Sequence, residues 1–515
     1  MAIAAVPIVL GALYVRHELA TQGRLGFPLD DPYIHLQFAR NLSSGHGWSF
    51  NPGEPVPGAT SPLWVVLLAG VHLAGVPLEW APIVLGLTCA ALAAVLAFEV
   101  GLAAGLPPAL AALAGLAVGA NGRFTWASVS GMEPCLAAAL LALLLRLALT
   151  EGRGIGRGVA LGLVAGLATQ ARPELIVIAL LVGVAELVRV VRAGGEAGGT
   201  TRRWLGVAPY FGMLALVMLP HLAFCLVTAG RPLPNTYYSK TVIRLGLSPD
   251  VLAGKRASYF ADAAVWLWRD DVVTAVAFAF GLPLWWLRRR PGGAGLIPLA
   301  PLVFWVSAWI TTPLHYSLSR YTIPLIPCVA VVAMAPFDLI LARLRAPLVR
   351  RAGVALAALA VLFAAGYRQF QYEGLYQANV DNILKMQVAM GEWVRKELPP
   401  GARVATNDIG AITWYGGHPC IDTEGLVSTD LITLMLARLG TPRFTQMDDA
   451  LLDYLPAKHP AYVIVFPDWY PALVRAPWLE RVHEIDYPNN TGGGNALVAY
   501  RVVLPGATGS RGGAP

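Results

Sequence analysis

The chain has 515 residues, of which 56% are hydrophobic and 13% are charged, and its mean hydropathy is +0.58. Soluble domains carry about 25% charged residues, so this composition excludes a soluble enzyme, a disordered chain and a nucleic-acid-binding protein. The net charge of +7 divides into +10 for residues 1–366 (26 Lys and Arg against 16 Asp and Glu) and −3 for residues 367–515 (12 against 15). The basic excess therefore lies in the apolar part of the chain, where the positive-inside bias of membrane proteins explains it.

Twelve apolar segments of helical length follow one another along the chain. They cover residues 2–16, 62–76, 80–100, 108–120, 133–149, 157–171, 174–191, 205–228, 271–287, 295–312, 321–342 and 352–366. A helix that crosses a membrane needs about 20 apolar residues, so several of these segments are short. The first segment has no basic flank before it and no small-residue cleavage site after it, so we expect a retained helix rather than a signal peptide.

Basic connectors between the segments predict their orientation. Arginines gather within 189–203, 288–290 and 343–351, and such connectors face the cytoplasm. When the twelve segments are counted back from these connectors, the N-terminus is cytoplasmic only if one segment does not cross the membrane. The best candidate is 62–76, which is short and begins at a proline, and we expect it to be interfacial or re-entrant. The prediction is therefore about eleven crossings and a first external loop over 17–79.

The last part of the chain has a different pattern. A helical pattern runs over 376–397. Short β-like runs follow at 403–407, 461–466 and 496–503. Residues 367–505 are predicted to form an extracytoplasmic α/β domain, followed by a disordered tail over 506–515. With the apolar module of residues 1–366, the sequence predicts a polytopic α-helical membrane protein with interfacial helices and a C-terminal α/β domain.

Two adjacent carboxylates, Asp30 and Asp31, follow the first helix at the start of the external loop. Ionisable groups close to lipid are costly to desolvate, and their presence there favours a function. Aspartate is also a good N-cap, so capping the next helix explains the pair equally well. That next helix is amphipathic, with Ile34, Phe38 and Leu42 on one face, and it is predicted to lie along the membrane interface.

The loop sequence DDPYIHLQFARNLSSGHGWSFNPGEPVPGATSPLW (30–64) resembles the first external loop of C-type (GT-C) membrane glycosyltransferases, most of all the bacterial arabinofuranosyltransferase-like branch. Further matches follow in order, with SGMEP at 130–134, ARPE at 171–174, RPLPNTYYSK at 231–240, RYTIPLIP at 320–327 and DIGAITWYGGHPCIDTEGLV at 408–427. The resemblance implies a cell-membrane enzyme that moves a sugar from a polyprenyl-phosphate donor to an extracytoplasmic glycan, lipid or protein acceptor.

The resemblance also implies roles for three acidic residues. In the family pattern the first carboxylate of the pair is the general base, so Asp30 is expected to take the acceptor proton during a single inverting displacement. Asp31 is expected to orient Asp30, bind the acceptor or hold a metal. Glu133, in SGMEP, is the candidate second acid, although a carboxylate near a helix N-terminus is also explained by the helix dipole. Together Asp30, Asp31 and Glu133 would supply oxygen ligands to a divalent cation if they meet in space, which leaves a metal cofactor open.

Three basic residues are expected to bind the donor phosphate. Arg172 lies in a short external turn, where a guanidinium forks onto a phosphate or reaches lipid headgroups. Lys240 closes a proline-stiffened loop that is rich in hydrogen-bonding groups. Arg320 stands at the outer start of a helix, where a cation opposes both the helix dipole and the positive-inside trend. A purely structural role for Arg320 is therefore less attractive.

Further polar residues are predicted to contact the donor or the acceptor. Asn235, Tyr237 and Tyr238 precede Lys240 in the same loop, and His315 lies in the external turn before Arg320. A lone histidine is more often structural. In the tail, an acceptor glycan or a packed core would equally explain Asp408, Trp414, Tyr415, Asp422 and Glu424.

Two other classes of protein remain open. A transporter or lipid flippase of the cell envelope would carry ionisable groups near helix midpoints and internal repeats, and neither stands out. A non-catalytic scaffold leaves the Asp30–Asp31 pair unexplained. The sequence contains no glycine-rich nucleotide motif, which favours a lipid-linked donor over a nucleotide sugar. The expected partners are the donor, the acceptor and membrane lipids, with no nucleic acid.

Overall fold

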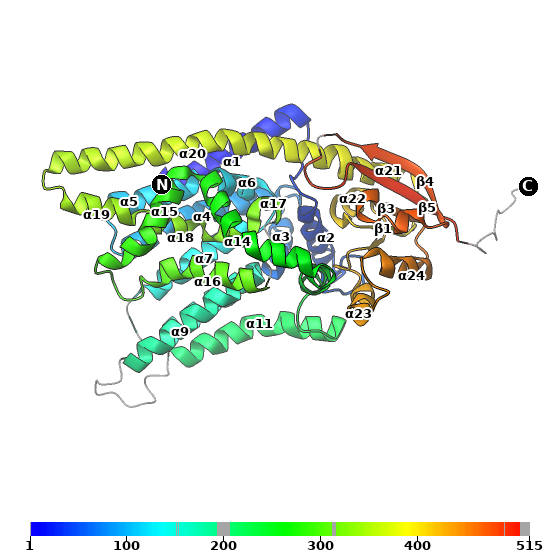
Figure 1. Ribbon diagram of the computed structural model, residues 1–515, viewed down its shortest axis with the longest axis horizontal. Helices are drawn as coiled ribbons and strands as arrows, with labels where there is room; N and C mark the ends of the chain where they lie inside the picture. The colour runs from blue at the N-terminus through cyan, green and yellow to red at the C-terminus, as the bar shows by residue number, and fades with distance from the viewer. Residues whose placement is uncertain are drawn as a thin grey trace, which may run out of the picture. The chain divides into compact units, whose positions relative to one another are not determined.

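The computed structural model describes residues 2–150, 152, 154–192, 206–311, 316–488 and 490–504 (Figure 1). Contacts divide the chain into two compact units. The first contains residues 1–25, 60–223 and 252–377, and the second contains residues 26–59, 224–251 and 378–515.

The first unit is helical. Its elements are α1 (Ala2–Gln22), α3 (Pro62–Leu73), α4 (Ala81–Ala103), α5 (Pro108–Gly119), α6 (Gly122–Val129), α7 (Pro134–Ala148), α8 (Ile155–Ala171), η1 (Pro173–Leu175), α9 (Ile176–Arg192), α11 (Val207–Ala229), α14 (Pro249–Asp270), α15 (Val272–Leu284), η3 (Trp285–Leu287), α16 (Leu296–Thr311), α17 (Tyr316–Ser319), η4 (Arg320–Leu325), α18 (Ile326–Ala333), α19 (Ala335–Arg343) and α20 (Pro347–Ile383). Each of the twelve predicted apolar segments overlaps a helix. The ends of α11, α14 and α20 belong to the second unit.

Several of these helices have the length and composition of membrane spans. In the described part of the chain, five helices are long and apolar enough to cross a membrane. A sixth is counted if α6 and α7, which meet at an angle of 116°, form one broken span. Five further apolar helices are shorter, including α3, which covers Pro62–Leu73 of the predicted interfacial segment. The predicted number of about eleven crossings is not confirmed and stays a prediction.

The helices of the first unit approach one another through small residues. α4 packs against α1, α5 and α7. Its buried side contains Ala90, Ala93, Ala94 and Ala97, none of which is exposed. At Gly86 of the same helix an added Cβ would lie 2.0 Å from the Ser128 carbonyl oxygen. Such contacts are typical of helices that pack closely without large apolar side chains between them.

The second unit is a small α/β domain with two additional segments of the chain. Its helical elements are α2 (Asp31–Ser43), α12 (Asn235–Tyr237), η2 (Tyr238–Ile243), α13 (Arg244–Leu247), η5 (Leu384–Val388), α21 (Ala389–Glu397), α22 (Ile409–Gly416), α23 (Thr429–Arg438), α24 (Asp448–Lys458), η6 (Pro467–Trp469) and η7 (Leu473–Arg475). Its strands are β1 (Val404–Thr406), β2 (Cys420–Asp422), β3 (Tyr462–Val465), β4 (Leu479–Asp486) and β5 (Ala496–Val502).

The strands form one mixed sheet in the order β2-β1-β3-β5-β4, drawn as arrows in Figure 1. β2, β1 and β3 are parallel, whereas β5 runs antiparallel to β3 and β4. Successive residues of β3 point to opposite faces, so Val463 packs with Met435 and Leu451 while Ile464 packs with Met390 and Val394. Helices therefore cover both faces of this sheet.

The three predicted strands coincide with β1, β3 and β5, while β2 and β4 were not predicted. The contact-based division also differs from the one drawn by hydropathy at residue 366. It places the Asp30–Asp31 loop (26–59) and the segment 224–251 in the unit that contains the sheet. The contact-based division reports how residues pack and not which of them lie in the membrane. The boundary drawn by hydropathy at residue 366 therefore stays a prediction.

Candidate functional site

In the second unit, the Asp30 carboxylate lies at the N-terminus of α22. It immediately precedes α2, yet within the described part of the chain it makes no capping hydrogen bond to that helix. Instead its Oδ2 accepts a hydrogen bond from the Gly410 N–H at 2.7 Å, and its Oδ1 accepts one from the Ala411 N–H at 2.7 Å. The first N–H groups of a helix and its dipole favour a negative charge at this position. The Asp30 side chain therefore caps α22 and not α2.

The contact between Asp30 and α22 is close enough to require a glycine. A Cβ added at Gly410 would lie 2.1 Å from the Asp30 carbonyl oxygen and 2.7 Å from its Oδ2. No side chain fits between the two without moving the helix or the carboxylate. Sequence alone does not reveal this contact, because GAIT (410–413) has the pattern of an ordinary apolar helix start.

A neighbouring carboxylate, Asp408, affects the ionisation of Asp30. Burial raises the pKa of Asp30 well above its usual range, and the charge of Asp408 raises it further, against the two backbone hydrogen bonds that lower it. Burial raises the pKa of Asp408 to about 7, although the Gln387 amide donates a hydrogen bond to it at 2.8 Å, and the charge of Asp31 adds to the rise. A carboxylate with a pKa near neutrality is well matched to general acid–base work.

Aromatic contacts join α2 to α22 beside this carboxylate. The Arg40 guanidinium lies over the Trp414 ring, 4.5 Å from its centroid. The Tyr33 and Tyr415 rings meet edge to face with their centroids 5.7 Å apart. Trp414 and Tyr415, for which an acceptor contact and core packing were equally good explanations, thus pack at least partly against α2.

The RPLPNTYYSK segment is fastened to the loop that follows β2. The buried Asn235 amide donates to the Leu426 carbonyl at 3.2 Å and to the Thr429 hydroxyl at 2.8 Å. The Ser239 hydroxyl donates to the Glu424 carbonyl at 2.6 Å. These contacts make Asn235 an anchor of the segment, and both of its amide hydrogens are used within the protein.

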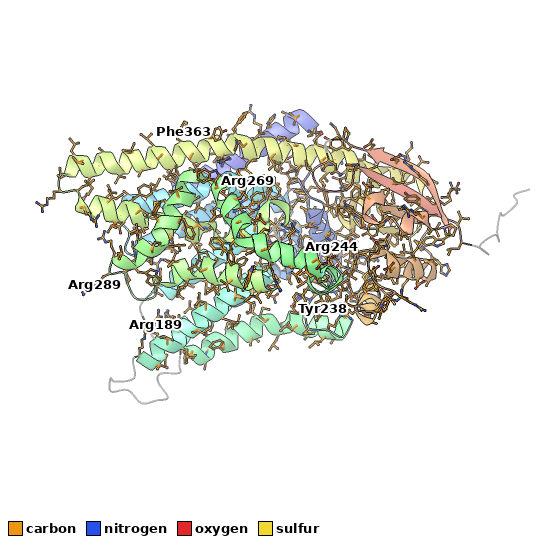
Figure 2. The ribbon with its side chains drawn as sticks, viewed as in Figure 1. Arg189, Tyr238, Arg244, Arg269, Arg289 and Phe363 are labelled. Carbon is orange, nitrogen blue, oxygen red and sulfur yellow. The ribbon has the colours of Figure 1, made fainter. Side chains whose placement is uncertain are left out.

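Lys240 itself is half-buried in the π-helical turn η2. Such turns are frequent at functional sites. The described part of the chain gives its ammonium no ion pair. Tyr237 is 40% exposed, whereas the Tyr238 ring lies 5.2 Å from the Arg231 guanidinium. Tyr238 and Arg244, which follows in α13, are labelled in Figure 2.

In the first unit, three of the predicted residues come together. Glu133, only 2% exposed, lies 3.4 Å from the Arg172 Nη2. The Arg172 Nη1 donates a hydrogen bond to the Arg320 carbonyl oxygen at 3.0 Å. The Tyr321 ring lies near both guanidinium groups, at 4.8 Å from Arg172 and 5.9 Å from Arg320. The Arg172 Nε also lies 3.7 Å from the more exposed Glu174 carboxylate. The structure thus gathers two carboxylates and two buried cations at the ends of apolar helices.

The start of α3 is tied to the same place. The Ser61 hydroxyl donates to the Ala171 carbonyl at 2.7 Å, next to Arg172. The Trp64 indole donates to the Gly131 carbonyl at 3.1 Å, two residues before Glu133. The TSPLW sequence that precedes and opens α3 therefore fixes the loops that carry this carboxylate and this arginine.

A second buried pair in the first unit, Arg123 and Asp270, is not predicted by the sequence; the guanidinium and the carboxylate are 2.6 Å apart. The only sequence signal was the presence of charges at the edges of apolar segments, in NGR (121–123) and RDD (269–271). Sequence alone does not pair residues that far apart.

Two predictions about the site stay open. His315 lies outside the described residues. Among the described residues, no group of three or more His, Cys, Asp or Glu side chains is arranged to hold a metal ion. The ligand set of Asp30, Asp31 and Glu133 stays a prediction.

A comparison with family models matches the C-terminal region. A family described as "Domain of unknown function (DUF8728)" matches residues 372–501. A comparison with curated protein sequences finds no match.

Comparisons of structure cover nearly the whole chain. ArnT from Cupriavidus metallidurans bound to undecaprenyl phosphate is 14% identical with a TM-score of 0.61, and the match covers 98% of each chain. The Archaeoglobus fulgidus oligosaccharyltransferase is 12% identical with a TM-score of 0.59, over 98% of this chain and 75% of that one. The mycobacterial arabinofuranosyltransferase AftD is 16% identical with a TM-score of 0.50, over 97% of this chain and 41% of that one. All three have the GT-C architecture, and this chain therefore has the GT-C glycosyltransferase fold.

Proposed function

We propose that this protein is an integral membrane glycosyltransferase that moves a sugar from a polyprenyl-phosphate donor to an extracytoplasmic glycan, lipid or protein acceptor. The observation that carries the proposal is the buried cluster of Glu133, Arg172 and Arg320. Guanidinium groups in a dehydrated site suit a phosphate, which they bind through parallel hydrogen bonds. The ArnT structure, which has the same fold, holds undecaprenyl phosphate, and this supports a lipid-linked phosphate as the ligand.

The proposed chemical step is a single inverting displacement. Asp30 takes the proton of the acceptor hydroxyl while the hydroxyl oxygen forms a bond to the anomeric carbon of the donor sugar. The bond from that carbon to the phosphate oxygen breaks, and its electron pair leaves with the polyprenyl phosphate. Arg172, Lys240 and Arg320 are assigned to the developing negative charge on the phosphate. Asp31 is assigned to orienting Asp30 or the acceptor.

The surroundings of Asp30 support its assignment as the base. Each of its oxygens accepts one backbone hydrogen bond. An ionised carboxylate has about four acceptor positions, so positions remain for an acceptor hydroxyl. The raised pKa of Asp30 makes it a stronger base than an ordinary aspartate once it is ionised.

The proposal includes an orientation in the cell membrane. We place the N-terminus in the cytoplasm and the C-terminal α/β domain outside, as the basic connectors indicate. Lys396, near the end of α21, has an 83% exposed side chain. A Lys396→Cys variant should therefore react with a membrane-impermeant maleimide in intact cells, and labelling only after lysis would contradict the orientation. The native cysteines are all buried, so the background should be low.

The function is tested with the full chain in nanodiscs. A panel of polyprenyl-phosphate sugars, including arabinofuranose, mannose and other hexoses, is offered together with glycan, lipid and peptide acceptors. We expect sugar transfer that Asp30→Asn abolishes. Asp453→Asn is the matched control, because Asp453 is 69% exposed in the same unit. Loss of transfer in Asp31→Asn but not in Asp30→Asn would overturn the assigned roles. No consumption of any donor, with a solute crossing proteoliposomes instead, would favour the transporter alternative.

A further inference from the structure

The side chain of Arg123 is almost completely buried in the first unit, although it is charged. It stands in the first turn of α6 and is 1% exposed. Its Nε donates to the Asp270 Oδ1 at 2.7 Å and its Nη2 donates to the Asp270 Oδ2 at 2.6 Å. The Tyr372 hydroxyl donates to the same carboxylate at 3.2 Å. Arg123 and Asp270 thus form a two-pronged pair that α20 also supports through Tyr372.

The remaining nitrogen of Arg123 holds a different part of the chain. Its Nη1 donates to the carbonyl oxygens of Leu318 at 3.0 Å and Ser319 at 3.1 Å, and to the Thr322 hydroxyl at 3.0 Å. One guanidinium therefore joins a fixed carboxylate to a single short turn. The hydrogen bonds that this guanidinium makes to the described residues all go to Asp270 or to this turn.

The turn that Arg123 holds has a strained backbone. Leu318 and Ser319 have φ values of 59° and 50°, in the left-handed region that side chains other than glycine rarely adopt. Two such residues in succession persist only where the surroundings hold them, and such strain gathers at functional sites. The donor that bonds both of their carbonyl oxygens is Arg123.

The strained turn leads directly into Arg320. The Arg320 carbonyl oxygen accepts a hydrogen bond from Arg172. The Arg320 guanidinium lies 5.9 Å from the centroid of the Tyr321 ring. The backbone direction at Ser319 sets where the Arg320 side chain begins. Relaxation of the turn would therefore move the Arg320 guanidinium without removing any of its own atoms.

We propose that Arg123, with Asp270 as its counter-ion, is a positioning residue that clamps the turn at Leu318 and Ser319 and so places Arg320 for a phosphate on a polyprenyl lipid. The inference rests on the phosphate-binding role proposed above for Arg320. A buried ion pair alone is weak evidence of a role in stability, because well-packed apolar residues often replace it without loss. The hydrogen bonds from the Arg123 Nη1 to the turn give a functional reason for an arginine at this position.

The test is a double-mutant cycle on the binding of undecaprenyl phosphate to the full chain in nanodiscs. Arg123→Lys keeps the charge but cannot reach both the carboxylate and the turn. We expect it to weaken binding about tenfold, and to add nothing in an Arg320→Ala background, because coupled residues do not act additively. Arg157→Lys is the matched control, since Arg157 pairs with Glu186 in the same unit and takes no part in the turn. It should bind like the wild type.

The outcomes separate the two proposals. Failure of the wild-type protein to bind undecaprenyl phosphate would contradict the proposed function and remove the basis of the inference. Normal wild-type binding with an equal loss from Arg123→Lys in both backgrounds would overturn the inference alone. If Arg123→Lys does not fold, Thr322→Val removes only one of the three acceptors of Nη1. Thr322→Val should then weaken binding less than Arg123→Lys, and this loss of binding should disappear in the Arg320→Ala background. An undiminished loss in that background would overturn the positioning role of Arg123.

Discussion

Replacing Gly410 by alanine should displace the proposed base without changing any ionisable group. The new Cβ would lie 2.1 Å from the Asp30 carbonyl oxygen and 2.7 Å from its Oδ2. The nearer of these atoms belongs to the backbone, so no side-chain rotation relieves the clash. Either α22 or the start of α2 must move, and the hydrogen bonds from Gly410 and Ala411 to Asp30 lengthen or break.

The size of the effect follows from these contacts. Overpacking costs about 1–3 kcal/mol, and a hydrogen bond to a charged group contributes about 1.5–3 kcal/mol. General-base help is typically worth about 10²- to 10⁴-fold. A base that is displaced rather than removed should lose part of that factor, so we expect kcat to fall roughly 10- to 100-fold. Because the two backbone bonds lower the pKa of Asp30, their loss should also move the acidic limb of the pH–rate profile to higher pH.

The assay is transfer from the accepted polyprenyl-phosphate donor over a range of pH, with thermal unfolding measured in parallel. Gly374→Ala is the control, because Gly374 is also helical and an added Cβ there meets no atom within 4 Å. It should leave both the rate and the profile unchanged. A Gly410→Ala enzyme with a wild-type rate and an unshifted acidic limb would refute the idea that α22 positions Asp30.

Further predictions concern charge. The wild-type rate should rise with pH as Asp30 loses its proton, at a pH well above the usual range of an aspartate pKa, and Asp408→Asn should shift this rise to lower pH by removing a neighbouring negative charge. Burial raises the pKa of Asp422 to about 7, so the stability that its protonated form supplies is lost as pH rises through that value. As the pH rises from the usual range of an aspartate pKa to about 7, the melting temperature of the wild type should therefore fall relative to that of Asp422→Asn. Arg172→Ala takes away the cation 3.4 Å from buried Glu133 and should destabilise the fold by about 3–5 kcal/mol.

Each of these predictions has an opposing result. An acidic limb that stays in place in Asp408→Asn would show that Asp408 does not act on the base. A constant difference in melting temperature between Asp422→Asn and wild type would remove Asp422 as a source of pH dependence. If Glu133→Gln does not restore stability in the Arg172→Ala background, the destabilisation does not arise from the Glu133 charge.

The sequence could predict those features that depend on local pattern. Apolar runs predicted the helices, and β-branched runs predicted β1, β3 and β5. β2 was missed because its sequence CID contains a single β-branched residue, and β4 because its sequence LERVHEID is largely polar, as suits a strand at the edge of a sheet. The charge rule placed Glu133, Arg172 and Arg320 on one side of the membrane, and the structure brings these three together.

Long-range contacts could not be predicted in this way. The Asp30 carboxylate is bonded by N–H groups of residues 380 and 381 positions away. Arg123 and Asp270 are separated by 147 positions. Neither periodicity nor composition specifies such pairs, because they result from the way the helices and the domain pack. The sequence therefore identified most candidate residues, while their partners became visible only in the structure.

Transfer by a single inverting displacement is tested by measuring the anomeric configuration of the product. The full chain in nanodiscs is given the polyprenyl-phosphate sugar that it consumes and its acceptor, and the new glycosidic linkage is analysed by NMR. We expect inversion at the anomeric carbon, with one polyprenyl phosphate released per sugar transferred and both lost in Asp30→Asn. Retention of configuration, or undiminished release by Asp30→Asn, would contradict it.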